Sequence, residues 1–377
     1  MFKKITASFI VSRVLLFVFA LLAVDLLPFQ NISTAANSSI GLPYLQWIWG
    51  NFDGVHYVSI ANSGYQYPNY AFFPLYPLFI SIIKSVTFLQ TLQVGLVISY
   101  ISFLLSLFFV YKIILLDFKK TVAFRSIVFL LFFPLTFYYT SVYADSLYLL
   151  LSVVSFYAAR KKNWFLAGIF GFLAGLNRLI GIVLLPVLLL EWYAQHKWKM
   201  EDGRWKIIIS RFFRDKAFFI LLIPLGIIGY GVYLQINFGD FFLFQKAMVE
   251  WGQSKLVIPL QVVYRYFKIF TTTQINIIYF IAIVEFVSTI LYFLLTWYVF
   301  KKTRVSYGLL MLLTFLIPAL TGTFQGMPRY ILHTFPAFIA LALLTNRSKK
   351  LFWATIAIFL VLQFVFVALF TRGYFVA

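Results

Sequence analysis

The 377-residue sequence contains no cysteine, only 3 histidines and only 11 acidic residues. The lack of cysteine excludes disulfide bonds, thiolate catalysis and cysteine-based metal sites. No glycine-rich phosphate loop, His-Glu-x-x-His motif or nucleophile elbow occurs, so nucleotide-driven chemistry is unsupported. Because acidic side chains are so few, a carboxylate placed beside a membrane is a candidate for function by default.

Apolar residues dominate what is present. They make up 63% of the chain, with 47 phenylalanines, whereas charged residues make up 11%. These proportions do not fit a soluble domain and predict an all-α polytopic membrane protein. Residues 1–27 hold Lys3 and Lys4 and then a long apolar run without a clear small-residue cleavage site. We therefore expect an uncleaved first span and not a signal peptide.

The net charge of +20 would suit a nucleic-acid partner, but the basic residues gather in short clusters between apolar runs. Such clusters mark cytoplasmic loops, so we expect no nucleic-acid partner. The clusters are Lys3/Lys4, Lys119/Lys120/Arg125, Arg160/Lys161/Lys162, Lys197 to Lys216, Lys301/Lys302/Arg304 and Arg347/Lys349/Lys350. They predict about eleven membrane-spanning helices, with the N-terminus cytoplasmic and the C-terminus outside. The expected spans are residues 1–27, 94–116, 126–140, 145–159, 163–177, 179–192, 217–236, 275–299, 306–321, 331–345 and 351–370.

We expect a single membrane-embedded domain over residues 1–377, with external loops at 28–93 and 237–274 and a basic cytoplasmic loop at 191–216. Within the first loop, 72–89 is apolar, but Pro74, Pro77 and Lys84 make it a poor straight span. We expect an interfacial or re-entrant helix there. The basic loop is amphipathic and is expected to lie on anionic lipid headgroups. The loop 237–274 either contacts an acceptor or is simply solvated.

A polar island at 49–57 in the first external loop carries Asp53. Gly54 beside it permits a tight turn, and His56 is close enough to share a site. This makes Asp53 the strongest candidate for a catalytic carboxylate. The alternative is that Asp53 only caps a short helix beginning at Gly54.

Other charged groups fall on the predicted outer side, where the positive-inside rule gives them no role. Asp145 lies in a hydroxyl-rich turn, where it is either functional or a helix cap. Arg178 lies in a tight turn between apolar spans and has the planar fork that grips phosphate, unless it only snorkels to headgroups. Arg329 and His333 are four residues apart at a helix start and share one face. They are candidates for a second phosphate or hydroxyl contact, with a structural histidine as the alternative.

These groups suit transfer of a sugar from a lipid-phosphate donor. An arginine would hold the phosphate leaving group, and a carboxylate would take the proton from an acceptor hydroxyl. A single base acting opposite the leaving group gives inversion. Phosphate leaves without protonation, so no paired acid is needed. The chemistry requires no cofactor and no metal, and we predict no metal site, although an Asp53–Asp145 pair has the ligands to hold a divalent ion.

Several motifs carry a resemblance to a known family. They are Phe52-Asp53-Gly54-x-x-Tyr57 with Ile60-Ala61-x-x-Gly64-Tyr65, the run Ala71-Phe72-Phe73-Pro74-Leu75-Tyr76-Pro77, Tyr143-x-Asp145, Arg178-x-x-Gly181 and Pro328-Arg329-Tyr330. The chain resembles the PIG-V (GPI mannosyltransferase II) family of GT-C glycosyltransferases. It departs from the family pattern in having Phe52 where tryptophan is usual and Asp145 where glutamate is usual.

The resemblance implies a GT-C fold and a mannosyltransferase that uses polyprenyl-phosphate mannose. It implies Asp53 as the catalytic base, and we expect Asp145 to be the second catalytic residue. We expect the donor phosphate and sugar to be bound by Arg178, Arg329, His333, His56, Tyr57 and Tyr143. The compact length favours a prokaryotic homologue in the plasma membrane, with its active site on the external face. The expected acceptor is a glycan or glycolipid other than the GPI anchor.

Other functions remain open at this point. A transporter or lipid flippase would use the same charges, but no inverted repeat is apparent and the charges gather on one side instead of at the midplane. A GT-C enzyme that moves another sugar is a second alternative. A scaffold subunit without catalytic activity is a third, and it would tolerate loss of Asp53.

Overall fold

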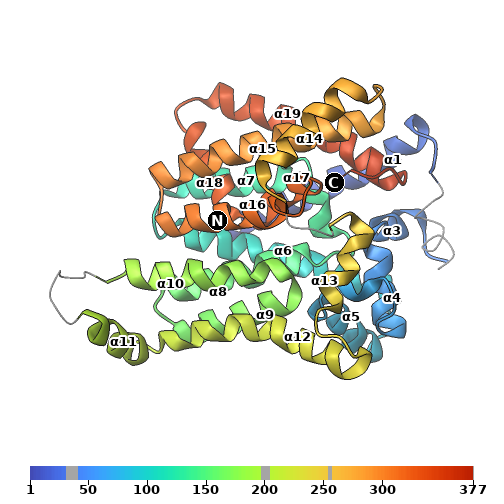
Figure 1. Cartoon of the computed structure of the whole chain (residues 1–377). Coiled ribbons are helices and arrows are strands. Elements are labelled where there is room, and N and C mark those ends of the chain that lie inside the picture. Colours follow the sequence, from blue (N-terminus) through green and yellow to red (C-terminus); the bar gives the residue numbers. More distant parts are fainter. Residues whose placement is uncertain (31–40, 197–203, 254–256, 377) are drawn as a thin grey trace.

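The computed structural model describes residues 1–30, 41–196, 204–253 and 257–376. Throughout these ranges the chain forms helices joined by loops, and no strand occurs in them (Figure 1). The all-α prediction is therefore confirmed. Polar residues start several helices: Gln90 and Gln93 form a capping box, and Asn163 and Asn276 each accept an N–H bond from the residue three positions later.

Five helical segments are long and apolar enough to cross a membrane. They are α1 (Phe2–Leu26), α6 (Thr91–Ile114), the η5–α12 segment (Ala217–Phe238), α15 (Ile277–Lys302) and α19 (Lys349–Thr371). A sixth candidate is the pair Met327–His333 and Phe335–Leu344, which is bent by 90°. The protein is thus an integral membrane protein with an all-helical fold.

The remaining predicted spans coincide with shorter helices. These are α7 (Lys120–Phe132), α8 (Asp145–Arg160), α9 (Trp164–Asn177), α10 (Leu184–Ala194), α16 (Val305–Ala319) and α18 (Phe335–Leu344), with 3-10 segments η3 (Thr136–Thr140), η4 (Leu179–Val183) and η7 (Ile331–His333) between some of them. Each predicted span therefore overlaps a helix, whereas the total of eleven crossings stays a prediction.

The first long loop is largely helical. It contains α3 (Tyr44–Trp47), η1 (Ile48–Gly50), α4 (Asp53–Ser63), η2 (Asn69–Ala71) and α5 (Leu75–Ser85), and residues 31–40 lie outside the described part. With 11 residues, α5 is about 16 Å long, roughly half the thickness of a hydrocarbon core. The stretch 72–89 accordingly holds a helix too short to cross, which fits the sequence-based expectation.

The two other predicted loops also carry helices. The loop 237–274 contains α13 (Leu243–Ala247), η6 (Met248–Trp251) and α14 (Pro259–Thr272), apart from residues 254–256, which are not described. The basic loop 191–216 contains α11 (Arg204–Arg214), and its residues 197–203 are not described. In Figure 1, α13 lies between the lower helices α9 and α12 and the upper helices that include α17 (Met327–Tyr330).

The centre of the bundle is α8, which packs against α6 and α9. Small residues allow α9 to approach the η5–α12 segment closely. A Cβ at Gly168 would lie 2.1 Å from the Phe219 carbonyl oxygen, and one at Gly226 would lie 2.4 Å from the Phe172 carbonyl oxygen. Backbones meet here as they do at small-residue interfaces of membrane helices. This packing holds the C-terminal end of α9, and with it Arg178, in place.

An ionic network ties four elements at the end of α8 that carries Arg160. Arg160 makes two bonds to Asp117, of 2.6 and 2.8 Å, and lies 3.3 Å from Glu191. Arg304 approaches Glu191 to 3.0 Å, and the Tyr307 hydroxyl donates to Asp117 at 2.9 Å. Burial alone would raise the pKa of Asp117, but its bonds from Arg160 and Tyr307 hold that pKa below its ordinary value. Since α8 has 16 residues, this network lies about 24 Å from Asp145, at the other end of the helix.

Candidate active site

The loop that leads into Asp53 is fastened by three long-range hydrogen bonds. The Val142 N–H donates to the Trp49 carbonyl at 2.9 Å, and the Tyr143 hydroxyl donates to the Asn51 carbonyl at 2.8 Å. The Asn51 amide donates to the Phe370 carbonyl at 2.9 Å. The start of α4 is therefore held by the turn before α8 and by the end of α19.

Asp53 is the first residue of α4, and its carboxylate faces a cavity with 24% of the side chain exposed. Its Oδ2 lies 2.7 Å from Nη1 of Arg329. The carboxylate is thus engaged by a guanidinium from a distant part of the chain.

Asp145 is fully buried at the N-terminal end of α8 and is surrounded by three basic side chains. Arg329 grips it with Nε and Nη2, at 3.0 and 2.7 Å. Arg178 donates to Oδ2 at 2.9 Å, and His333 Nε2 lies 2.9 Å from Oδ1. The Asn177 amide donates to the Ala144 carbonyl at 2.9 Å, which fixes the end of α9 beside this carboxylate. Asp145 therefore organises the basic groups as a buried anchor.

Arg329 bridges the two carboxylates. Its Nη1 bonds to Asp53 while its Nε and Nη2 bond to Asp145 in the bidentate geometry typical of strong arginine–carboxylate pairs. Its guanidinium carbon lies 4.6 Å from the ring centre of Tyr143 and 4.9 Å from that of Tyr138, within cation–π range. The guanidinium fills the space between the carboxylates, so a divalent ion shared by Asp53 and Asp145 would meet a fixed positive charge. Within the described residues, no group of three or more His, Asp or Glu side chains is placed to hold a metal.

His333 lies behind Asp145, away from the cavity. The Asp145 carboxylate can only accept a hydrogen bond, so the Nε2 atom of His333 carries the proton and donates to it. The Nδ1 atom of His333 is then an acceptor without a hydrogen-bond partner in the described part of the chain. Its ring packs edge-on against Tyr148 and Tyr330. His333 thus contacts the site through Asp145.

A cavity of about 1030 Å³ opens at this end of the bundle. Five of the eight predicted site residues line it: Asp53, His56, Tyr57, Arg178 and Arg329. The other three, Asp145, His333 and Tyr143, lie behind its wall in contact with Arg329 or with one another. The remaining wall comes from Phe52, Val55, Ala71, Phe72, Phe73, Asn177, Leu179, Ile180, Phe244, Gln245, Met248, Trp251, Gln253, Ile317, Pro318, Leu320, Thr321, Gln325, Gly326, Tyr330 and Phe375.

One side of the cavity is aromatic. The His56 ring stacks on Phe72 with centroids 4.7 Å apart, and Trp251 packs edge-on against both at 5.7 and 5.4 Å. His56 Nδ1 lies 2.6 Å from Asn69 Oδ1, which fixes the ring. Burial raises the pKa of Tyr57, so its hydroxyl stays protonated as a hydrogen-bond donor or acceptor.

Arg178 faces the cavity and bonds to the carboxylate of Asp145. Burial alone would lower the pKa of Arg178, but the charge of Asp145 offsets this effect and holds the pKa above its ordinary value. The guanidinium is therefore permanently charged. With 18% of its side chain exposed, it presents positive charge to the cavity.

Some lining residues have no clear signal in the sequence. Phe375 reaches the cavity from the segment after α19, and Gln325 reaches it from the turn before α17. Trp251 belongs to the loop 237–274, for which contact with a ligand was one of two expectations, and the structure places it in the cavity wall. Only the folded contacts bring these segments together.

The fold and the site define a polytopic membrane protein with a charged, aromatic-walled cavity at one end of its helices. The sequence profile of the mannosyltransferase (PIG-V) family matches residues 3–268, well over half of the chain. The chain therefore belongs to this family. The match covers Asp53, Asp145 and Arg178, while Arg329 and His333 lie beyond it.

Comparison with solved structures finds the Archaeoglobus fulgidus oligosaccharyltransferase, in a crystal structure with zinc and sulfate. The identity is 14% and the TM-score 0.43, with 96% of this chain and 53% of that chain covered. The chain thus spans about half the length of that protein. No curated protein matches the chain significantly.

Proposed function

We propose that the protein is an inverting mannosyltransferase that moves mannose from a polyprenyl-phosphate donor to a hydroxyl of a lipid-linked or cell-surface acceptor. The observation that carries the proposal is that a partly exposed carboxylate, Asp53, and a guanidinium, Arg178, both face one aromatic-walled cavity. Membership of the mannosyltransferase family supports mannose as the transferred sugar. The cavity of about 1030 Å³ is at the upper end of the usual range for ligand sites, which suits two substrates.

In the proposed step, the acceptor hydroxyl oxygen attacks the anomeric carbon of mannose as the bond to the phosphate oxygen breaks. Asp53 takes the hydroxyl proton, and the phosphate leaves with the electron pair of the broken bond. Attack opposite the leaving group inverts the anomeric configuration. Arg178 stabilises the negative charge that grows on the phosphate.

The two carboxylates have different roles in this proposal. Asp53 is exposed enough to meet an acceptor hydroxyl, whereas Asp145 is buried and bonded to three basic groups, so it acts as a positioning residue. Arg329 holds the Asp53 carboxylate in one orientation through its 2.7 Å contact. Proton transfer needs such a fixed geometry at the acceptor oxygen.

The proposal places the site on the external face of a prokaryotic plasma membrane. The support is the distribution of basic residues: Arg160 and Arg304 lie in the network at the end of α8 remote from Asp145. Clusters of this kind favour the cytoplasmic side. The apolar wall residues Leu179, Ile317 and Leu320 suit a polyprenyl chain that enters from the membrane.

The test is mannose transfer in purified membranes from labelled polyprenyl-phosphate mannose, comparing wild type with Asp53→Asn. The substitution keeps the side-chain size and removes the base, so we expect transfer to fall by about 10²- to 10⁴-fold with the fold intact. Asp25→Asn, which changes an exposed aspartate at the end of α1, is the matched control and retains activity.

Equal transfer by wild type and Asp53→Asn would refute the base assignment. Transfer from a different polyprenyl-phosphate sugar alone would keep the mechanism and change the donor. No transfer by any variant would favour a transporter of lipid-linked sugars over an enzyme.

A further inference from the structure

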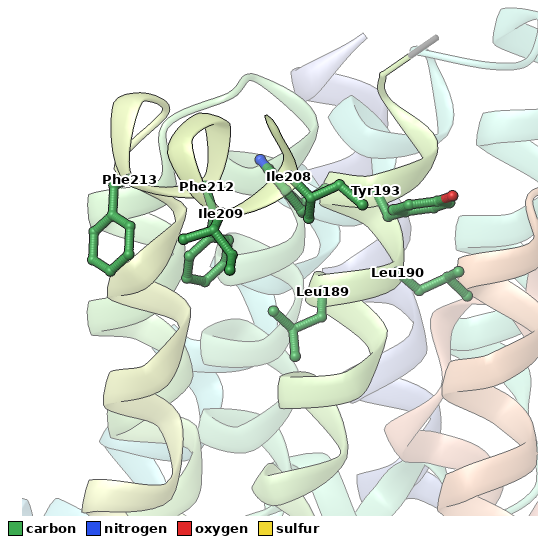
Figure 2. Close-up of a pocket in the computed structure, with 8 residues that line it drawn as sticks. Leu189, Leu190, Tyr193, Ile208, Ile209, Phe212 and Phe213 are labelled. Carbon is green, nitrogen blue, oxygen red and sulfur yellow. The ribbon is translucent and has the colours of Figure 1, made fainter. Parts of the chain in front are cut away.

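A second, entirely apolar groove lies between α10 and α11. Its volume is about 430 Å³, and its lining includes Leu189, Tyr193, Ile208, Ile209, Phe212 and Phe213 (Figure 2). No charged side chain is among the described residues that line it. Figure 2 shows the side chains of α11 reaching toward Leu189 of α10. The groove adjoins Glu191 of the ionic network, so it is at the end of the bundle remote from the candidate active site.

Specific contacts hold the two walls of the groove at a fixed spacing. Asp215, just after α11, accepts a hydrogen bond from Trp192 Nε1 at 3.1 Å and lies 2.8 Å from His196 Nε2. His196 Nδ1 in turn lies 2.8 Å from the Trp192 carbonyl oxygen. The Trp192 ring packs edge-on against Phe212 with centroids 5.1 Å apart. The groove is therefore a built feature of the α10–α11 pair.

The segment that forms one wall of the groove is basic in sequence. Residues 204–216 contain five basic residues and one acidic residue, Asp215. Asp215 lies 3.1 Å from Trp192 Nε1 and 2.8 Å from His196 Nε2, and the basic residues of the segment outnumber it. Arg214 and Lys216 are exposed beside the groove-lining Phe213.

We infer that this groove binds one acyl chain of an anionic phospholipid, whose headgroup phosphate lies against Arg214 and Lys216. The apolar walls match the chain, and the basic segment matches the charge of the headgroup, a combination by which basic amphipathic helices select anionic lipids. A zwitterionic lipid offers the same chain without net negative charge. The site is separate from the mannosyltransferase proposal and stands whether or not that proposal holds.

The test uses phospholipids with brominated acyl chains, which quench tryptophan fluorescence at short range. The full chain is placed in two series of vesicles, one with brominated phosphatidylglycerol and one with brominated phosphatidylcholine. Both series cover the same range of mole fractions. Trp192 lies beside the groove, so its contribution is obtained by comparing wild type with Trp192→Phe. We expect half-maximal quenching of this contribution at an anionic mole fraction at least about threefold lower than for the zwitterionic lipid.

Three variants separate the parts of the site. Arg214→Gln with Lys216→Gln abolishes the preference for the anionic lipid, whereas Lys349→Gln with Lys350→Gln, the same charge change at the start of α19, leaves it unchanged. Ile209→Gln, at a position with 55% exposure that should tolerate the change, weakens quenching by both lipids because it makes the groove polar.

Equal quenching by both lipids in wild type would overturn the inference. So would an equal loss of preference in the two double variants, which would show general attraction to the surface. Unchanged quenching in Ile209→Gln would refute the acyl-chain site. If Trp192→Phe fails to fold, native mass spectrometry of the wild type replaces it, and equal retention of both lipids is then the refuting result.

Discussion

Phe52 holds an unusual backbone conformation directly before Asp53. Its φ of 57° and ψ of −117° lie in a region of backbone conformation that residues other than glycine rarely adopt. Such a conformation costs about 1–3 kcal/mol and persists only where its surroundings enforce it. Here the Phe52 ring packs against Phe370 at 5.6 Å and Phe375 at 5.9 Å. These rings hold the turn that presents Asp53 to the cavity.

Substitutions at this position separate the ring from the backbone strain. Phe52→Ala and Phe52→Gly both lose the ring contacts, but glycine adopts positive φ without strain. We expect Phe52→Gly to be about 1 kcal/mol more stable than Phe52→Ala in thermal unfolding. Both variants should lose about ten- to a hundredfold in transfer activity, because the Asp53 carboxylate is no longer fixed. Equal stability of the two variants would contradict the strain argument.

Single residues of the site were identifiable from the sequence, but their roles were not. Scarcity of charge and the positive-inside rule selected Asp53, Asp145, Arg178 and Arg329. The difference between the exposed Asp53 and the buried Asp145 depends on tertiary packing that no local pattern encodes. The catalytic roles themselves stay predictions.

At the scale of elements, α14 and the residues just before it, from Val257, form a strap across the turn that leads to Arg329. The Val257 N–H donates to the Leu320 carbonyl at 2.8 Å, and Arg265 donates to the Gly322 carbonyl at 2.7 Å. The Tyr266 hydroxyl donates to Glu285 of α15 at 2.5 Å. Glu285 is a buried acid in a membrane-spanning helix, where an unpaired polar group is costly. The strap thus fixes the segment from which Arg329 extends.

Removing one partner of the Tyr266–Glu285 bond should be worse than removing both. We expect Tyr266→Phe to destabilise the protein by about 1–3 kcal/mol, since it leaves the Glu285 carboxyl without this donor. Adding Glu285→Leu should recover most of the loss, because two apolar groups then face each other. Thermal unfolding in detergent measures both.

Tyr264→Phe on the same helix is the control, since its side chain is 69% exposed, and it should change nothing. A double variant less stable than Tyr266→Phe would refute the pairing argument.

The helices were largely predictable as elements, and the connections between them were not. Apolar length placed the first span at 1–27 and the last at 351–370, against α1 at Phe2–Leu26 and α19 at Lys349–Thr371. The 90° bend between η7 and α18 had no such signal, because it depends on how the segment packs. The length of an apolar run predicts the length of a helix, whereas a bend depends on tertiary contacts that the run does not encode.

At the scale of the whole molecule, the ionic network around Asp117 joins α8, α10, α16 and the loop between α6 and α7. The folded-state pKa of Asp117 lies below its unfolded value. Its carboxylate therefore stabilises the fold above the unfolded pKa, and this contribution is lost as the pH falls through the folded pKa.

Asp117→Asn should accordingly lower the thermal unfolding temperature at neutral pH. The difference from wild type should shrink as the pH is lowered through the acidic range where Asp117 of the wild type becomes protonated. Unfolding temperatures measured across a pH series check this. A difference that stays constant down to strongly acidic pH would show that the charge of Asp117 is not what stabilises the network.

The contacts that complete the site also lay beyond reach of the sequence. Asn51 bonds to Phe370 across 319 residues, and Asp53 bonds to Arg329 across 276. Hydropathy and charge give the order of the spans and the side on which a loop lies. Which helices are neighbours depends on side-chain complementarity over the whole bundle.

The bridge from Arg329 to Asp53 has a consequence for the time at which the protein becomes competent during its synthesis. Asp53 leaves the ribosome early, and its guanidinium partner follows only after 276 further residues. Until α17 is in the membrane, neither the orientation of Asp53 nor the charge balance around Asp145 is established. In a half-inserted chain the cavity therefore lacks its completed set of charged contacts. Assembly of the site thus marks the near-completion of membrane insertion.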